Sequence, residues 1–232
     1  MASTVTELMM RRMGAKSGSS IDWESIARGM IDRTTVFNVD SLIEGKTSLG
    51  VCLFYGRTGL QSIELPSTLT SISSSLFYGC TGLTSIVIPN SVTTIGDSAF
   101  NGCNNLTSIT IGTSVKSVGT TALQNCSKLT SLVFPNSVTS IGNQCCRGDN
   151  KLEIIDIGTG ITRIDNMAFY QCSKVQYYIV RATTPPTLGS AALAGVSSYV
   201  IYVPDASVND YKAASGWSSY ASKILPISDL TT

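Results

Sequence analysis

Apolar residues recur with a period of 23 along the middle of the chain, between residues 57 and 180. Each unit is counted from a first position at residue 57, 80, 103, 126, 149 or 172, and the apolar residues stand three, six and eight residues after it. The last two are separated by one residue, so both side chains turn to the same face of a β-strand. A second apolar pair follows, and it is expected to face the same interior. The three main columns are Leu60, Leu83, Leu106, Leu129, Leu152 and Val175; Ile63, Ile86, Ile109, Leu132, Ile155 and Tyr178; and Leu65, Ile88, Ile111, Phe134, Ile157 and Val180.

The first position of each unit is most often cysteine. Cys80, Cys103, Cys126 and Cys172 fill it, with Arg57 and Asp149 at the same position of two other units. A fixed period of roughly 20–29 residues with spaced Leu and Ile is typical of a leucine-rich solenoid. One coil cannot bury its apolar side alone, so we expect stacked coils with a continuous apolar spine. The predicted fold class is a β-rich leucine-rich repeat solenoid of 23-residue coils, with short N-terminal helices and a C-terminal helical cap.

The seven cysteines fit stacked coils better than a disulfide framework. An odd number leaves one thiol unpaired, and side chains stacked in parallel are poorly aimed for a disulfide. We therefore predict reduced cysteines that pack as small apolar residues. Metal binding is the alternative, but the chain has no histidine and no Cys-x-x-Cys pair. Neither a metal site nor a cofactor is predicted.

The ends of the chain depart from the repeat. Four segments are predicted: an anchoring helix and linker at residues 1–20, an N-terminal cap at 21–51, the solenoid at 52–181, and a C-terminal capping segment at 182–232. Within the last segment, Ser207 is expected to cap a short helix. Trp217 is expected to help cover the last coil.

The first helix begins with Thr4-Val5-Thr6-Glu7, the pattern of a capping box. Its apolar residues follow helical spacing. A Met-rich amphipathic helix on a flexible Gly/Ser tether suits docking to another subunit. We predict that it anchors the chain to other subunits or to a second copy; a frayed or folded-back terminus is the alternative. The anchoring residues are Val5, Leu8, Met9 and Met13.

Composition narrows the possible partners. The net charge is +1 and only 13% of residues are charged, so nothing favours nucleic acid as a partner. The chain lacks the stretch of about 18 apolar residues that membrane insertion requires. The first residues lack the apolar run of a signal peptide, so we expect the protein to be made in the cytoplasm.

Nothing in the sequence indicates an active site. Without histidine there is no Ser/His or Cys/His nucleophile, and neither of the two common Gly-rich phosphate-binding motifs occurs. Glu153, Asp156 and Asp165 fall in one unit with Arg163 and are interpreted as a surface charge network. We predict no catalytic residues and no enzymatic activity.

The outward positions of the predicted strands form a candidate binding surface. They lie five and seven residues after the first position of each unit and are rich in Ser. Solenoids bind partners on such extended faces; a solvated hydroxyl face is the alternative. The candidate residues are Glu64, Val87, Thr110, Val133, Ile154 and Asp156.

Residues Arg147-Gly148-Asp149 spell the tripeptide that integrins bind. Gly148 is also the ordinary glycine of the repeat, and Asp149 fills the cysteine position. A three-residue match is weak evidence, so coincidence is the favoured interpretation.

The unit Cys-x-x-Leu-x-x-Ile-x-Ile-Pro-x-x-Val-x-x-Ile-Gly-x-x-Ala-Phe resembles the BspA-like leucine-rich repeat, also called the Treponema pallidum type. Residues 80–102 match it at every position, and the resemblance covers about residues 52–180. The closing segment, 199–227, is similar to the C-terminal end of many such proteins from gut Bacteroidetes. The resemblance implies a non-enzymatic cell-surface protein that binds host proteins or other bacteria.

A short helix, a Gly/Ser linker and then a repeat is also similar to accessory proteins encoded by gut bacteriophages. Virion proteins need no export signal. The leading expectation is therefore a virion appendage, a fibre or decoration protein, made in the bacterial cytoplasm and attaching to a bacterial surface protein or glycan. The alternative is a BspA-like adhesion protein at the bacterial cell surface.

Overall fold

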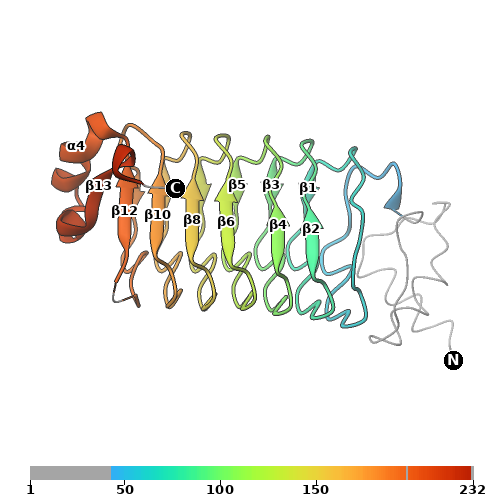
Figure 1. Cartoon of the computed structure of the whole chain (residues 1–232). Helices are drawn as coiled ribbons and strands as arrows, with labels where there is room; N and C mark the ends of the chain where they lie inside the picture. The colour runs from blue at the N-terminus through green and yellow to red at the C-terminus, as the bar shows by residue number, and fades with distance from the viewer. Residues whose placement is uncertain (1–42, 197, 231–232) are drawn as a thin grey trace, which may run out of the picture.

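The computed structural model describes residues 43–196 and 198–230. Over this range the chain winds into similar coils that stack in a row along one axis (Figure 1). The fold prediction is confirmed, because the structure is a parallel β-solenoid with coils of about 23 residues and a short C-terminal helix. The anchoring helix predicted within residues 1–20 and most of the predicted N-terminal cap lie outside the described residues.

One side of the solenoid, here called the short-strand side, is a continuous six-stranded parallel sheet. Each strand has two residues, an outward residue followed by an inward apolar one, and pairs with the strand of the next coil. Ile72 therefore lies beside Ile95, and Ile141 beside Ile164. In sheet order the strands are β1 (Ser71–Ile72), β3 (Thr94–Ile95), β5 (Ser117–Val118), β7 (Ser140–Ile141), β9 (Arg163–Ile164) and β11 (Thr187–Leu188).

Glycine ends several of these strands because neighbouring coils approach closely there. A Cβ atom added at Gly142 would lie 2.6 Å from the backbone carbonyl carbon of Gly119 in the previous coil. Backbone atoms cannot yield to such a contact, so the repeat keeps a residue without a side chain at this turn.

The other side, here called the long-strand side, has strands of three or four residues in two separate parallel sheets. Every pair that is formed joins equivalent residues of adjacent coils, as in Leu132 beside Ile155. No pairing joins β4 to β6 among the residues described. The two-stranded sheet contains β2 (Ser85–Val87) and β4 (Ser108–Thr110); the five-stranded sheet runs β6 (Ser131–Phe134), β8 (Ile154–Ile157), β10 (Tyr177–Val180), β12 (Val200–Val203) and β13 (Ile224–Pro226).

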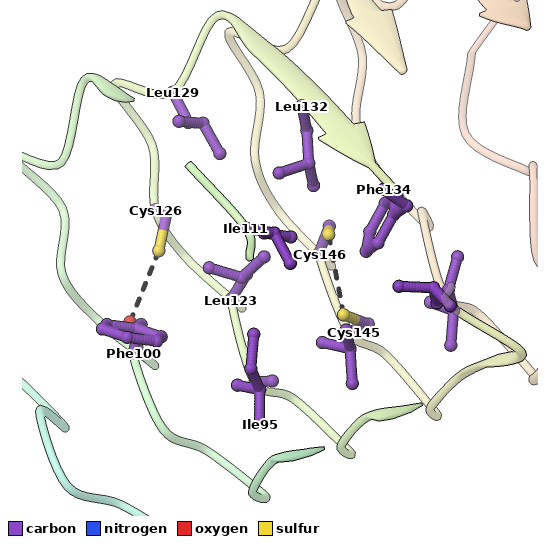
Figure 2. Packing of buried hydrophobic residues seen from close by; sticks show 14 of the residues in the cluster. Ile95, Phe100, Ile111, Leu123, Cys126, Leu129, Leu132, Phe134, Cys145 and Cys146 are labelled. Atoms are coloured by element: carbon purple, nitrogen blue, oxygen red, sulfur yellow. Dashed lines mark hydrogen bonds between the residues drawn. The ribbon is translucent and has the colours of Figure 1, made fainter. Parts of the chain in front are cut away.

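The apolar columns predicted from the sequence form the spine between the two sides. Leu83, Leu106 and Leu129, equivalent residues of three successive coils, are fully buried. Figure 2 shows part of this packing, with inward side chains of several coils meeting between the two sides. Ile109 is the exception, because it is only partly buried. It lies on β4, which has no strand partner on its β6 side.

The prediction of reduced, buried cysteines is confirmed. All seven are free, and all but Cys52 are buried. The cysteines in the first position of a unit also donate their thiol hydrogen to a backbone carbonyl 26 residues earlier. The Sγ–O distances are 3.0 Å for Cys80 to Phe54, 3.1 Å for Cys103 to Phe77, 3.3 Å for Cys126 to Phe100 and 3.0 Å for Cys172 to Cys146. Cysteine therefore adds a hydrogen bond between turns to its role as an apolar side chain.

Both sides of the solenoid continue into residues 182–232, the predicted C-terminal capping segment. β11, β12 and β13 all lie within residues 182–232 and extend the two sides. Thr187 pairs with Arg163, a step of 24 residues, so the coil that contains Pro185-Pro186 accommodates one extra residue. Three short 3-10 helices and one α-helix complete the end: η1 (Asp205–Ser207), α4 (Val208–Ala213), η2 (Ser218–Lys223) and η3 (Ile227–Asp229).

Two aromatic side chains attach this cap to the last coils. Trp217 is fully buried, as expected, and its Nε1–H donates to the carbonyl of Pro186 at 2.7 Å. The hydroxyl of Tyr211 donates to the carbonyl of Ala182 at 2.9 Å. The expected N-cap is wrong: Ser207 precedes α4 but makes no side-chain cap, because its hydroxyl donates instead to the carbonyl of Thr183 at 2.7 Å.

Candidate binding surface

The outward side chains of the long-strand side form two parallel rows along the solenoid. The strand register aligns equivalent positions, so that Val133 lies beside Asp156 and Asp156 beside Ile179. From N- to C-terminus, the first row is Ser85, Ser108, Ser131, Ile154, Tyr177 and Val200, and the second is Val87, Thr110, Val133, Asp156, Ile179, Tyr202 and Leu225.

The structure places the candidate residues predicted from the sequence on this surface, with one exception. Val87, Val133 and Ile154 are exposed, at 64%, 58% and 40%. Thr110 is also exposed, and Asp156 is half-buried. Glu64 is exposed but belongs to no strand. Their role in binding stays a prediction.

The C-terminal part of the surface is aromatic and apolar, unlike the Ser-rich N-terminal part. Tyr177 and Tyr202 lie side by side, with ring centroids 5.9 Å apart. Ile179 and Tyr202 are only 6% and 7% exposed although they stand in an outward row. Leu225 extends the apolar area to the edge strand and is 37% exposed.

The outward positions predicted from the sequence ended at residue 156 and did not include this aromatic part. Tyr177 follows Cys172 at the same interval as the other outward positions and could have been added. The continuous apolar run VIYV (200–203), rich in β-branched and aromatic residues, could have revealed one more strand.

An ion pair crosses the surface between two coils. Arg181 donates from Nε to Asp156 Oδ1 and from Nη2 to Asp156 Oδ2, both at 2.7 Å. These hydrogen bonds raise the pKa of Arg181, so the guanidinium stays charged. The charge network predicted around Arg163 is therefore two separate ion pairs, because Arg163 pairs with Asp165 at 3.2 Å and Asp156 pairs with Arg181. The two-pronged geometry orients both side chains at the rim of the aromatic part.

Two open hollows interrupt the surface. One, of about 490 Å³, lies between residues 62–65 and β2 and is lined by Glu64 and Val87. The other, of about 360 Å³, lies beside the ion pair and is lined by Val133, Asp156 and Arg181. Such hollows can receive side chains of a larger partner, since neither is closed over as a small-molecule site usually is.

The integrin-like tripeptide does not present its three residues together. Asp149 is fully buried. The guanidinium of Arg147 donates to Gln144 at 3.1 Å and lies over the ring of Tyr170, 5.7 Å from its centroid. A buried carboxylate cannot reach an external receptor, which favours coincidence for this motif.

Two further searches concern the described residues alone. Between residues 43 and 230, residue 197 aside, no three or more Cys, Asp or Glu side chains are grouped so that they could hold a metal ion. No helix in the same part of the chain is long and apolar enough to cross a membrane.

Comparisons with known structures agree with this geometry. The chain is similar to the T. pallidum leucine-rich repeat protein TpLRR, with 20% identity, a TM-score of 0.52, and coverage of 70% of this chain and 82% of the other. A leucine-rich cell surface protein of Faecalibacterium prausnitzii has 24% identity and a TM-score of 0.53, over 68% of this chain and 42% of the other. The pneumococcal vaccine antigen PcpA has 23% identity and a TM-score of 0.53, over 60% of this chain and 37% of the other.

The last two proteins are thus matched over less than half of their length, and at these identities the likeness concerns the fold. No curated protein matches the chain significantly. The model of the BspA type leucine-rich repeat region matches residues 47–176 in six copies. Together with the cysteine column and the two sheets, this match shows that the chain belongs to the BspA-type leucine-rich repeat family.

Proposed function

We propose that this chain is a non-enzymatic binding protein that recognises another protein through the long-strand side of its solenoid. The observation that carries the proposal is the set of apolar side chains that this side leaves exposed, Val87, Val133, Ile154 and Leu225, beside the partly exposed Tyr177. Exposed apolar side chains gathered on one face are typical of a protein interaction site.

The aromatic part has the composition of a protein-binding centre. Tyrosine supplies a large contact area at low conformational cost, and Tyr and Arg are enriched where binding energy concentrates. Tyr177 packs there against the buried ring of Tyr202, on paired strands β8, β10 and β12, and Arg181 directly follows β10. The Ser and Thr side chains beside Val87 and Val133 would form the polar remainder of the interface.

The proposed place of action is the bacterial cell surface, where the partner belongs to another cell. The Faecalibacterium prausnitzii protein is described as a cell surface protein, which supports this choice. The virion appendage remains a second proposal. It depends on the anchoring helix with Met9 and Met13, which lies outside the described residues. Contacts of that helix with other virion subunits, or with a second copy, would favour it.

Binding of the labelled full chain to intact bacterial cells tests the proposal. The variants Tyr177→Ala and Leu225→Ala should weaken binding about tenfold or more, because hot-spot truncations cost more than about 1.4 kcal/mol. Matched variants on the short-strand side, Thr94→Ala and Thr187→Ala, should leave binding unchanged. Equal loss in both sets, with folding preserved, would contradict the assignment of the surface.

Treatment of the cells before binding identifies the chemical class of the partner. Protease treatment should abolish binding, whereas periodate oxidation of surface glycans should leave it intact. The opposite pattern would show a glycan partner and overturn the proposal of protein recognition.

A further inference from the structure

Asp149 occupies a position that four other coils fill with cysteine. It stands in the column between Cys126 and Cys172, and its side chain is fully buried. Neither carboxyl oxygen has a hydrogen-bond partner. A buried carboxylate without a partner is far more costly than a buried thiol, so its protonation state needs an explanation.

The cysteines show what the position requires. Each donates its thiol hydrogen to a backbone carbonyl 26 residues earlier, as Cys126 does to Phe100 and Cys172 to Cys146. For residue 149 the equivalent carbonyl is that of Leu123. An ionised carboxylate has no hydrogen to donate, whereas a neutral carboxyl group has one. Only the neutral acid could therefore make the bond that the thiols make, although in the structure both Asp149 oxygens are without a partner.

The surroundings of Asp149 also favour the neutral acid. The titratable groups that face it are thiols: Cys126 from the preceding coil, Cys145 and Cys146 from the preceding corner, and Cys172 from the following coil. None of them carries a positive charge. Burial raises the pKa of Asp149 well above its ordinary value, against a smaller opposing effect of the Cys126 backbone N–H.

The nearest cations in the sequence, each two residues away, do not compensate for the burial. The guanidinium of Arg147 lies over the Tyr170 ring and donates to Gln144, and Lys151 is exposed. Ionised Asp149 would thus be a buried charge without a counter-ion, and the Cys126 backbone N–H would offset only part of the cost of burial.

We propose that Asp149 is a pH-sensitive element of the solenoid: it is held as the neutral acid when the coils are closed, and loss of its proton opens the coil at residues 149–171. The step is a simple ionisation in which the O–H bond breaks and the proton goes to water. The carboxylate keeps the bonding electron pair and becomes solvated when the coil opens. That coil includes β8, so opening also releases Ile154 and Asp156 from the long-strand side.

The pH dependence has a defined sign. An unfolded Asp titrates near pH 3.9, and in the folded chain burial moves the pKa upward. Between these two values the folded state binds one proton more than the unfolded state. Stability therefore falls as pH rises, and the unfolding equilibrium constant increases about tenfold per pH unit until the folded pKa is passed.

Urea unfolding of the full chain between pH 4 and pH 9 measures this dependence directly. Asp149→Asn has the same shape, keeps a hydrogen donor and cannot ionise. The ratio of the unfolding constants, native chain over variant, should rise about tenfold per pH unit and then level off. Asp149→Cys restores the residue found in the other coils of the column. It serves as the reference in place of Asp149→Asn if the Asn variant folds poorly, and the same pH dependence is expected.

Amide hydrogen exchange locates the opening. Relative to Asp149→Asn, the native chain should lose protection with pH in residues 149–171 and not in the coil at 80–102. A ¹³C NMR titration of the Asp149 carboxyl carbon in the native chain requires no variant. A midpoint near the ordinary Asp value, or a ratio of unfolding constants that is flat with pH, would overturn the proposal.

Discussion

The two sides of the solenoid differ in whether strand pairing continues without a break from coil to coil. The side with the shorter strands is the continuous one. The short-strand side has strands of two residues, yet its six strands pair without a break. The long-strand side has strands of up to four residues and is divided between β4 and β6. Continuity therefore does not follow strand length. Tight backbone contact follows strands of both sides, since an added Cβ atom would lie 2.6 Å from the Gly119 carbonyl carbon at Gly142, after β7, and 2.5 Å from the Asn136 nitrogen at Gly158, after β8.

The largest effect that tests this comparison comes from one column of the core. Ile155 is fully buried beneath the continuous part of the long-strand side, whereas Ile109, in the same column, lies at the break and is only partly buried. Ile155→Ala should lower the free energy of unfolding by about 2–5 kcal/mol. Ile109→Ala should cost about half as much or less, because less apolar area leaves water on folding. Urea denaturation of both variants measures the pair, and equal costs would show that the break does not weaken the core.

Amide exchange probes the break itself. Thr107 N–H donates to Thr84 and Glu153 N–H to Thr130, both at 2.8 Å, across two intact coil junctions. The amide of Thr130 occupies the same position at the β4–β6 junction, where the strands do not pair. A backbone hydrogen bond contributes about 1 kcal/mol net, so Thr130 should exchange several-fold faster than Thr107 and Glu153. NMR-detected exchange resolves the three amides, and similar rates would mean that the sheets join in solution.

The two ion pairs offer a smaller contrast between the sides. Arg181 and Asp156 form a two-pronged pair on the long-strand side, and Arg163 and Asp165 form a single contact of 3.2 Å on the short-strand side. Both are solvent-exposed, so double-mutant cycles should give coupling energies within about 1 kcal/mol, with the two-pronged pair the larger. Raising the salt concentration should reduce both coupling energies. A larger value for Arg163–Asp165 would contradict the importance of geometry here.

The smallest effect concerns the corner that leads away from each short strand. Met167 adopts φ 55°, and the equivalent residues Ser75, Ser98, Thr121 and Gln144 have φ of 52–54°. Residues other than glycine are strained in this left-handed region of backbone conformation. Met167→Gly should therefore change thermal stability by no more than about 1 kcal/mol and in the stabilising direction, since relief of strain outweighs the added freedom of the unfolded chain. Met167→Ala is the control and should be neutral.

The interior could be predicted from the sequence because each column repeats the same residue type at a fixed interval. Leu83, Leu106 and Leu129 need only the period and the alternation rule to be placed inside. Three features could not be obtained this way. The break beside Ile109 arises from backbone separation that no residue type signals, since Ile109 has the same identity as Ile86. The Arg181–Asp156 pair joins residues from two coils across a weakened repeat.

The third feature is the aromatic part of the binding surface. Tyr177 lies five residues after Cys172, so the period places it at an outward position, although it was not among the candidates. Tyr202 lies beyond the last unit that begins with cysteine, and only the apolar run at 200–203 indicates its strand. The hydroxyl of Ser207 illustrates a related limit, because a local capping pattern cannot reveal that a carbonyl 24 residues away accepts the same hydrogen.

The fixed register between coils also limits how the gene can change in length. Because each residue lies beside its equivalent 23 positions away on nearly every strand, duplication or deletion of whole units leaves all columns aligned and keeps the aromatic cap at the end. A shorter insertion within a strand would rotate every later side chain out of its column, so tolerated insertions should fall at corners such as Pro185-Pro186. The lengths of related solenoids are therefore expected to differ by whole 23-residue units, which gives a simple basis for comparing related genes.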